Sequence, residues 1–102
     1  MTMTEHHPLA LLREELDRLD QDLLDTIRKR IECGVRIAEY KSANDVPMMQ
    51  PGRVNLVKER AARYGSEHGV DPGFLVALYE LIIREMCRVE DLVIDQLVEG
   101  VR

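Results

Sequence analysis

Two cations, Arg30 and Lys41, lie where a long amphipathic helix should carry apolar side chains. At about 100° per residue, residues 9–41 place their apolar side chains on one stripe of a helix, and both cations fall within it. The stripe contains Leu9, Leu12, Leu16, Leu19, Leu23, Ile27, Gly34, Ile37 and Ala38. Because a buried cation without a partner is costly, we expect this pair to bind an anionic group.

The small residues between the two cations leave room for a ligand. Gly34 and Ala38 lie on the same stripe, between Arg30 and Lys41. A separation of eleven residues places the two Cα atoms about 16 Å apart on a helix. If each side chain reaches inward by about 6 Å, the remaining gap fits one small anion.

Three further charged residues can join this pair. Arg13 precedes Arg30 by about 25 Å along the helix axis, so it can reach the same small ligand only from a second chain. Arg53 opens a second predicted helix. Glu90 lies on an apolar stripe of a third predicted helix, where a carboxyl is either paired or tends to keep its proton. Since arginine binds a carboxylate through two hydrogen bonds, the set predicts a small dicarboxylate ligand.

Each of these three residues also has a structural interpretation. Arg13 can pair with Asp17 one turn along the helix. Arg53 can be a solvated residue at a helix start, and Glu90 can form a buried ion pair with a core arginine. The residues alone leave these alternatives open.

The chemistry expected of such a site is the rearrangement of a bound dianion, without cofactor or metal. The sequence has no plausible nucleophile with a base, no metal-binding cluster and no glycine-rich phosphate loop. Cations and one hydrogen-bonding acid can hold a flexible dianion in a reactive shape and stabilise charge that develops in the transition state.

The composition is that of a single helical domain. Its 102 residues are 45% hydrophobic and 32% charged, and the net charge of -5 argues against a nucleic-acid partner. No apolar run is long enough for a membrane span. Cys33 and Cys87 lack metal-type spacing and are interpreted as reduced core thiols of a cytoplasmic protein. We expect a flexible tail at residues 1–7 and one domain at residues 8–102.

Proline and glycine divide the chain into three predicted helices, and the fold class is all-α. The first begins near Pro8 and ends at about residue 41 or 42, the second covers residues 51–66, and the third runs from Pro72, capped by Asp71, to about residue 98. A 34-residue helix is about 50 Å long, against a radius of gyration of about 13 Å for a compact domain of this size. We therefore expect an intertwined homodimer, although a coiled-coil seam is the plainer alternative.

These residues resemble the all-helical chorismate mutase family, the AroQ class. The likeness covers nearly the whole chain, through "LLREELDRLDQDLLDTIRKRIECGVRIAEYK", "VPMMQPGRV" and "GVDPGFLVALYELIIREMCRVEDLVI". It implies an intertwined homodimer of three-helix chains with two active sites and no cofactor. It also implies that Arg30, Lys41 and Arg53 bind the substrate from one chain and that Arg13 reaches in from the other. Glu90 stands where the family has Gln or Glu beside the breaking ether bond.

Two positions depart from the usual pattern of this family. Val54 replaces a Glu that contacts the C4 hydroxyl of chorismate, and Met86 replaces a small polar residue. The pocket at ring position four is therefore altered, and Gln50 is the residue we expect to offer an amide oxygen there.

The strings "PMMQPGR", "RAARYG", "GVDPGFL" and "CRVEDLVI" resemble most the family members that rearrange 4-amino-4-deoxychorismate to 4-amino-4-deoxyprephenate, on the way to p-aminophenylalanine units of antibiotics. The alternatives are an ordinary chorismate mutase, an isochorismate-pyruvate lyase of the same fold, which also carries Val after this arginine, and a non-catalytic helical dimer.

Overall fold

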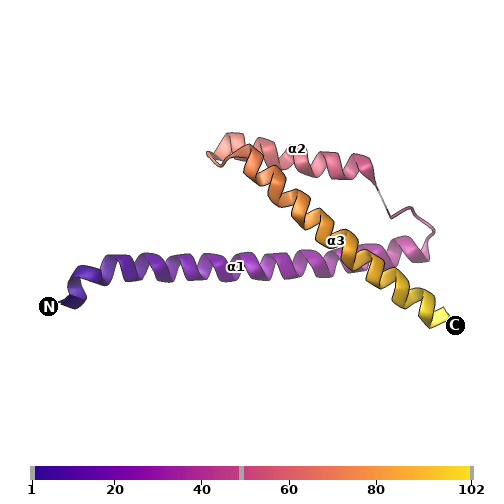
Figure 1. Ribbon diagram of the computed structural model, residues 1–102, viewed down its shortest axis with the longest axis horizontal. Coiled ribbons are helices and arrows are strands. Elements are labelled where there is room, and N and C mark those ends of the chain that lie inside the picture. The colour runs from indigo at the N-terminus through magenta and orange to yellow at the C-terminus, as the bar shows by residue number, and fades with distance from the viewer. Residues whose placement is uncertain (1, 49, 102) are drawn as a thin grey trace. The chain divides into compact units, whose positions relative to one another are not determined.

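The computed structural model describes residues 2–48 and 50–101, with side chains described for residues 7–48 and 50–97. Within that part of the chain there are three α-helices and no strand (Figure 1). They are α1 (Thr2–Ala43), α2 (Pro51–His68) and α3 (Pro72–Val101). The predicted all-α class and the long first helix are confirmed, and each helix ends one to three residues beyond its predicted end.

The chain divides into two compact units, Met1–Glu32 and Cys33–Arg102. The first unit belongs to α1 alone, and the second contains the end of α1 with α2 and α3. A single domain over residues 8–102 therefore stays a prediction.

The start of α1 differs from the predicted start. The helix begins at Thr2, and Pro8 lies inside it. Proline has no amide hydrogen to donate to the carbonyl four residues earlier, so a sequence rule places it in the first turn. Helix α1 instead continues through Pro8 with one backbone hydrogen bond missing, and it bends close to its N-terminus (Figure 1). The side chains of residues 1–6 lie outside the described part of the chain, and the flexibility of the 1–7 tail stays a prediction.

The leucines of α1 are uncovered in the unit Met1–Glu32. The five stripe leucines are between 47% and 62% exposed, and they are Leu9, Leu12, Leu16, Leu19 and Leu23. A lone helix has no second element against which to bury an apolar stripe, so its stability must come from packing elsewhere. In the described part of the chain, no helix is long and apolar enough to cross a membrane.

The C-terminus of α1 is closed by a residue in the left-handed conformation. Asp45 has φ of 59°, and the amide of Val46 donates to the carbonyl of Lys41 at 2.9 Å. This is a Schellman motif, in which the residue after the cap turns the chain back and satisfies a terminal carbonyl. Asn44 adds a bond from its side-chain amide to the carbonyl of Tyr40 at 2.9 Å.

The joint between α2 and α3 uses the same motif and then a side-chain cap. Gly69 has φ of 71°, and the amide of Val70 donates to the carbonyl of Gly65 at 3.0 Å. The carboxylate of Asp71 accepts a bond from the amide of Gly73 at 2.9 Å, which satisfies one free donor at the start of α3. The predicted cap and the predicted first-turn Pro72 are both confirmed.

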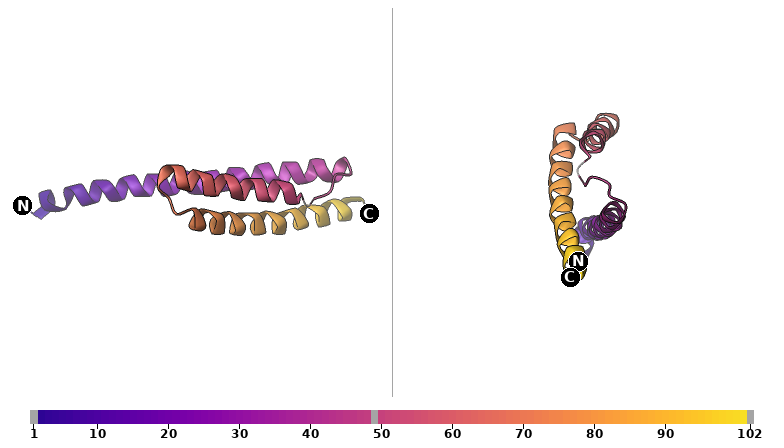
Figure 2. Two further views of the ribbon diagram at one scale, coloured as in Figure 1. Left: turned by 90° about the horizontal axis from the view of Figure 1, so that it is seen from above. Right: turned by 90° about the vertical axis from the view of Figure 1, so that its right-hand side faces the viewer.

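Helices α2 and α3 pack as a hairpin that diverges from this joint (Figures 1 and 2). Ala61 of α2 is 6% exposed, and further along the hairpin the ammonium of Lys58 lies 3.3 Å from the carboxylate of Glu80. Near the joint the approach is so close that a Cβ on Gly65 would lie 2.5 Å from the carbonyl oxygen of Val70. Small residues on α2 therefore set the separation of the two helices.

The two cysteines are not core residues. Cys33 is exposed and Cys87 is half-buried, and both are free thiols. The prediction of two core thiols is wrong, because Cys33 lies one position off the apolar stripe of α1 and faces away from it.

We predict that Gly65→Ala destabilises the protein by about 1–3 kcal/mol. The new methyl group meets backbone atoms, the carbonyl oxygen of Val70 and the Cα of Pro72 at 3.1 Å, which cannot move as a side chain end can. The free energy of unfolding is measured by urea titration. The control is Gly52→Ala, since nothing lies within 4 Å of a Cβ there. Equal effects of the two substitutions would contradict the close approach of the helices.

Candidate active site

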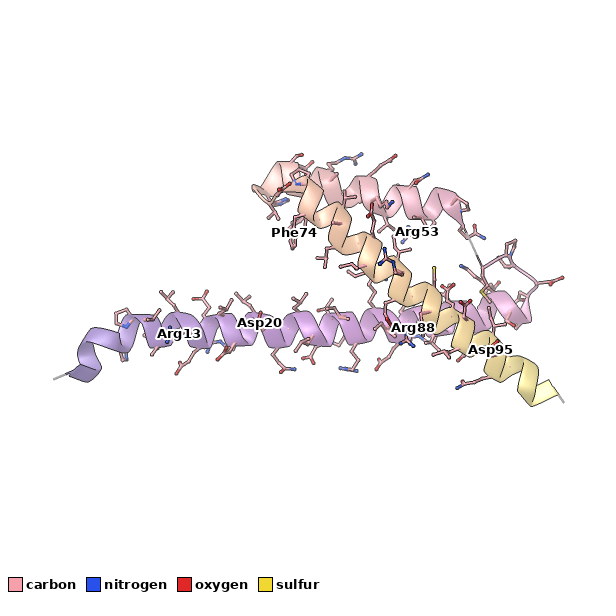
Figure 3. The ribbon with its side chains drawn as sticks, in the orientation of Figure 1. Arg13, Asp20, Arg53, Phe74, Arg88 and Asp95 are labelled. Carbon is pink, nitrogen blue, oxygen red and sulfur yellow. The ribbon has the colours of Figure 1, made fainter. Side chains whose placement is uncertain are left out.

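The eight predicted site residues divide between the two units. Arg13 and Arg30 lie in Met1–Glu32. The unit Cys33–Arg102 holds the others, which are Lys41, Gln50, Arg53, Val54, Met86 and Glu90. Figure 3 labels one arginine of each group, Arg13 on α1 and Arg53 at the start of α2.

The two arginines of the unit Met1–Glu32 lie on one uninterrupted stretch of helix. Arg13 is exposed and Arg30 is half-buried. Seventeen residues of helix separate them by about 25 Å along the axis. Their side chains therefore cannot bind the same small ligand from one chain.

Lys41 has a structural partner as well as a predicted ligand. Its ammonium donates to the carbonyl of Met48 at 3.0 Å, and the side chain is half-buried. This bond ties the last turn of α1 to the connection that leads into α2. An ammonium has three donors, so Lys41 can hold the connection and still donate to an anion.

Gln50 precedes α2, and its side chain has one defined orientation. The amide nitrogen donates to the carbonyl of Pro47 at 3.0 Å. Because a carbonyl only accepts, the nitrogen must face Pro47, which directs the amide oxygen the other way. That oxygen is the atom predicted to face ring position four of the substrate.

The first turn of α2 is electrically positive. Arg53 is exposed there, and the turn contains no acidic residue. The free amide groups and the dipole of a helix N-terminus favour negative charge, so the backbone reinforces the guanidinium. Val54, which follows, is half-buried and has no hydrogen-bonding group.

Met86 and Glu90 lie one turn apart on the same face of α3. Met86 is 8% exposed and Glu90 is half-buried. A Cβ on Gly34 would overlap the terminal methyl group of Met86 and lie 3.1 Å from its sulfur. The hollow predicted beside Gly34 and Ala38 is therefore partly filled from α3. Sequence reasoning missed Gly34 as a partner of Met86, although a glycine inside a helix was a signal.

A second carboxyl on α3 has a different environment. Glu85 accepts hydrogen bonds from the guanidinium of Arg88, one of them at 2.8 Å from Nε. This hydrogen bond, with the charge of Arg88, lowers the pKa of the Glu85 carboxyl. Because the side chains of the pair are exposed, the pair contributes little to the free energy of unfolding. That contribution is fully present above the ordinary pKa range of a glutamate and is lost as the pH falls through the lowered pKa of Glu85. Glu85 therefore serves as a comparison for Glu90.

A family model described as chorismate mutase type II matches residues 12–91. The chain belongs to this family. The matched range contains all eight predicted site residues, and the resemblance inferred from the sequence is confirmed.

Three relatives locate the chain within the chorismate mutase family. It is 66% identical over 94 residues to a 4-amino-4-deoxychorismate mutase of Streptomyces venezuelae, which covers 92% of this chain and 91% of the relative. A 4-amino-4-deoxychorismate mutase of Streptomyces pristinaespiralis is 52% identical over 82% of this chain and 65% of the relative. An isochorismate pyruvate lyase of Pseudomonas aeruginosa is 32% identical over 74% of this chain and 73% of the relative.

Proposed function

We propose that this chain rearranges 4-amino-4-deoxychorismate to 4-amino-4-deoxyprephenate, on the way to p-aminophenylalanine units of antibiotics. The chain is an isomerase of the chorismate mutase family. The observation that carries the substrate is the 66% identity to a 4-amino-4-deoxychorismate mutase across more than nine-tenths of both chains.

The reaction is a pericyclic rearrangement within one molecule. The ether C–O bond breaks as a new C–C bond forms, and no atom or electron enters or leaves. The protein must hold the reactive shape and stabilise the charge that develops on the ether oxygen. A millionfold enhancement requires about 8 kcal/mol from such effects. Positive side chains and one hydrogen-bonding carboxyl suit this task.

The cations bind the two carboxylates and the neighbouring oxygens of the substrate. Arg30, Lys41 and Arg53 come from one chain, supported by the remaining donors of Lys41 and the positive first turn of α2. Arg13 comes from a second chain, because about 25 Å of helix separates it from Arg30. Glu90 donates a hydrogen bond to the ether oxygen.

The second chain is another copy of this one, in an intertwined homodimer. The uncovered leucine stripe of α1 supports this proposal, because two such stripes can cover each other along their length. The dimer then contains two equivalent sites, each with residues of both chains. We place the enzyme in the cytoplasm, where its two free thiols remain reduced.

The group at ring position four lies among three residues. Val54 and Met86 bring no strong hydrogen-bonding group to this part of the pocket. Gln50 directs its amide oxygen away from Pro47, and we assign that oxygen to the substrate ammonium. A lyase that releases pyruvate from isochorismate is the second candidate, favoured by the 32% identity to such an enzyme and by Val54.

The three substrates separate these functions. We predict that the purified protein converts 4-amino-4-deoxychorismate with a kcat/KM at least about tenfold above that for chorismate or isochorismate, a difference of about 1.4 kcal/mol in transition-state binding. Product formation is followed by chromatography for each substrate separately. Faster turnover of chorismate or isochorismate would reassign the enzyme, and no turnover of any of the three would indicate a non-catalytic dimer.

Glu90 must carry its proton to donate to the ether oxygen. We predict that wild-type activity falls as the pH rises through the range in which this carboxyl ionises, whereas Glu90→Gln keeps activity and a flat profile, because an amide donates at every pH. Initial rates are measured from acid to alkaline pH. Glu85→Gln is the matched control on the same helix and should retain the wild-type profile. A folded Glu90→Gln variant that is inactive throughout would argue against this role.

The shared site can be tested by mixing defective chains. We predict that Arg13→Ala and Lys41→Ala each lower kcat/KM by about a hundredfold or more. A heterodimer of the two variants, isolated through two affinity tags, has one site with both substitutions and one with neither, so about half of the wild-type activity returns. The control heterodimer joins Arg30→Ala with Lys41→Ala and stays inactive, since each site then carries one substitution. Failure of the first heterodimer would contradict a site built from two chains.

A further inference from the structure

The side chain of Met86 ends against the backbone of α1 at Gly34. A Cβ at residue 34 would overlap the terminal methyl group of Met86 and lie 3.1 Å from its sulfur. Both residues are buried, and both belong to the unit Cys33–Arg102. The thioether therefore occupies the space that any side chain at residue 34 would need.

A glycine at this position is unfavourable for the helix itself. Gly34 lies inside α1, more than two turns from its C-terminal end. It is not among the residues with a positive φ, so its backbone conformation does not require glycine. Alanine would stabilise the helix more than glycine there, since glycine gains more backbone conformational entropy on unfolding. The function of Gly34 is thus in packing, and the atom packed against it is the end of a long, flexible side chain.

The contact lies between groups that bind the substrate under the proposed function. On α1, Gly34, the fully buried Ala38 and Lys41 follow one another at helical spacing on one face. On α3, Met86 precedes Glu90 by one turn. If the space at residue 34 were filled, the end of Met86 would have to move into the rest of the hollow predicted beside Ala38.

We propose that Gly34 is a positioning residue, a notch that receives the end of Met86 and so leaves the rest of the predicted hollow, beside Ala38, open to the substrate. This inference rests on the proposed function. The notch makes a long side chain at residue 86 compatible with a bound ligand, and it fixes Met86 as an apolar wall of the pocket. Gly34 and Met86 then act as a pair, and neither can be changed alone without altering the space for the substrate.

The substitution Gly34→Ala tests the pair. The added methyl group overlaps only the mobile end of Met86, so we expect the backbone and the unfolding midpoint to change little while Met86 rotates into the substrate space. The expected result is a KM for 4-amino-4-deoxychorismate raised by about tenfold or more, with a smaller change in kcat. Shortening the other partner as well, in Gly34→Ala/Met86→Ala, should return the KM to within about threefold of that of Met86→Ala alone.

The control substitution is Gly52→Ala, which adds the same methyl group to a helix where nothing lies within 4 Å. We expect it to leave the KM unchanged. Methyl NMR of labelled methionine gives a readout that does not need turnover: the Met86 signal should shift in Gly34→Ala and stay in place in Gly52→Ala. An unchanged KM in Gly34→Ala, or a double variant as impaired as Gly34→Ala, overturns the proposal.

The outcomes also separate this proposal from the proposed function. If wild-type protein converts only chorismate or isochorismate, the substrate assignment fails, and the KM comparison is made on the substrate that is converted. If it converts none of the three, the proposed function fails and the positioning role fails with it, whatever the NMR shift shows of the contact.

Discussion

The leucine stripe of α1 in the unit Met1–Glu32 needs a second apolar surface, because a lone helix cannot cover its own side chains. Under the proposed function, a second copy of the chain supplies that surface. The same constraint divides the site, since a helix long enough to carry both Arg13 and Arg30 places them too far apart to share a ligand. Dimer formation and substrate binding then become one requirement, and an isolated chain would lack a complete site.

Within the unit Cys33–Arg102, close backbone contacts decide where the site residues lie. The joint between α2 and α3 closes through Gly69 and the Asp71 cap, and Gly65 allows the two helices to approach. Lys41 holds the other connection through the carbonyl of Met48. These contacts set the start of α2 and the central turns of α3, where charged and apolar groups of the proposed pocket are found.

The electrostatic design needs no unusual side-chain chemistry. Guanidinium and ammonium groups generally stay charged over the physiological range, so under the proposed function the binding of two carboxylates depends on where the cations lie. Under the proposed function, specificity at ring position four is a separate matter that we assign to Gln50, Val54 and Met86. The Glu85–Arg88 pair shows how a carboxyl on α3 behaves when a neighbouring guanidinium binds it.

The sequence by itself determined the helices, because helical periodicity and the conformations of Pro, Gly and Asp are local properties, and its motifs determined the family. The residues that would bind the ligand stay a prediction. Asp71 and Pro72 predicted the start of α3 from neighbouring residues alone. The start predicted at Pro8 was wrong, since a helix can continue past one missing backbone hydrogen bond. Only the tertiary structure decided that Met86 lies against Gly34 and that Gly65 lies beside Val70. Such contacts join residues that no local period relates, and they depend on how closely two backbones can approach.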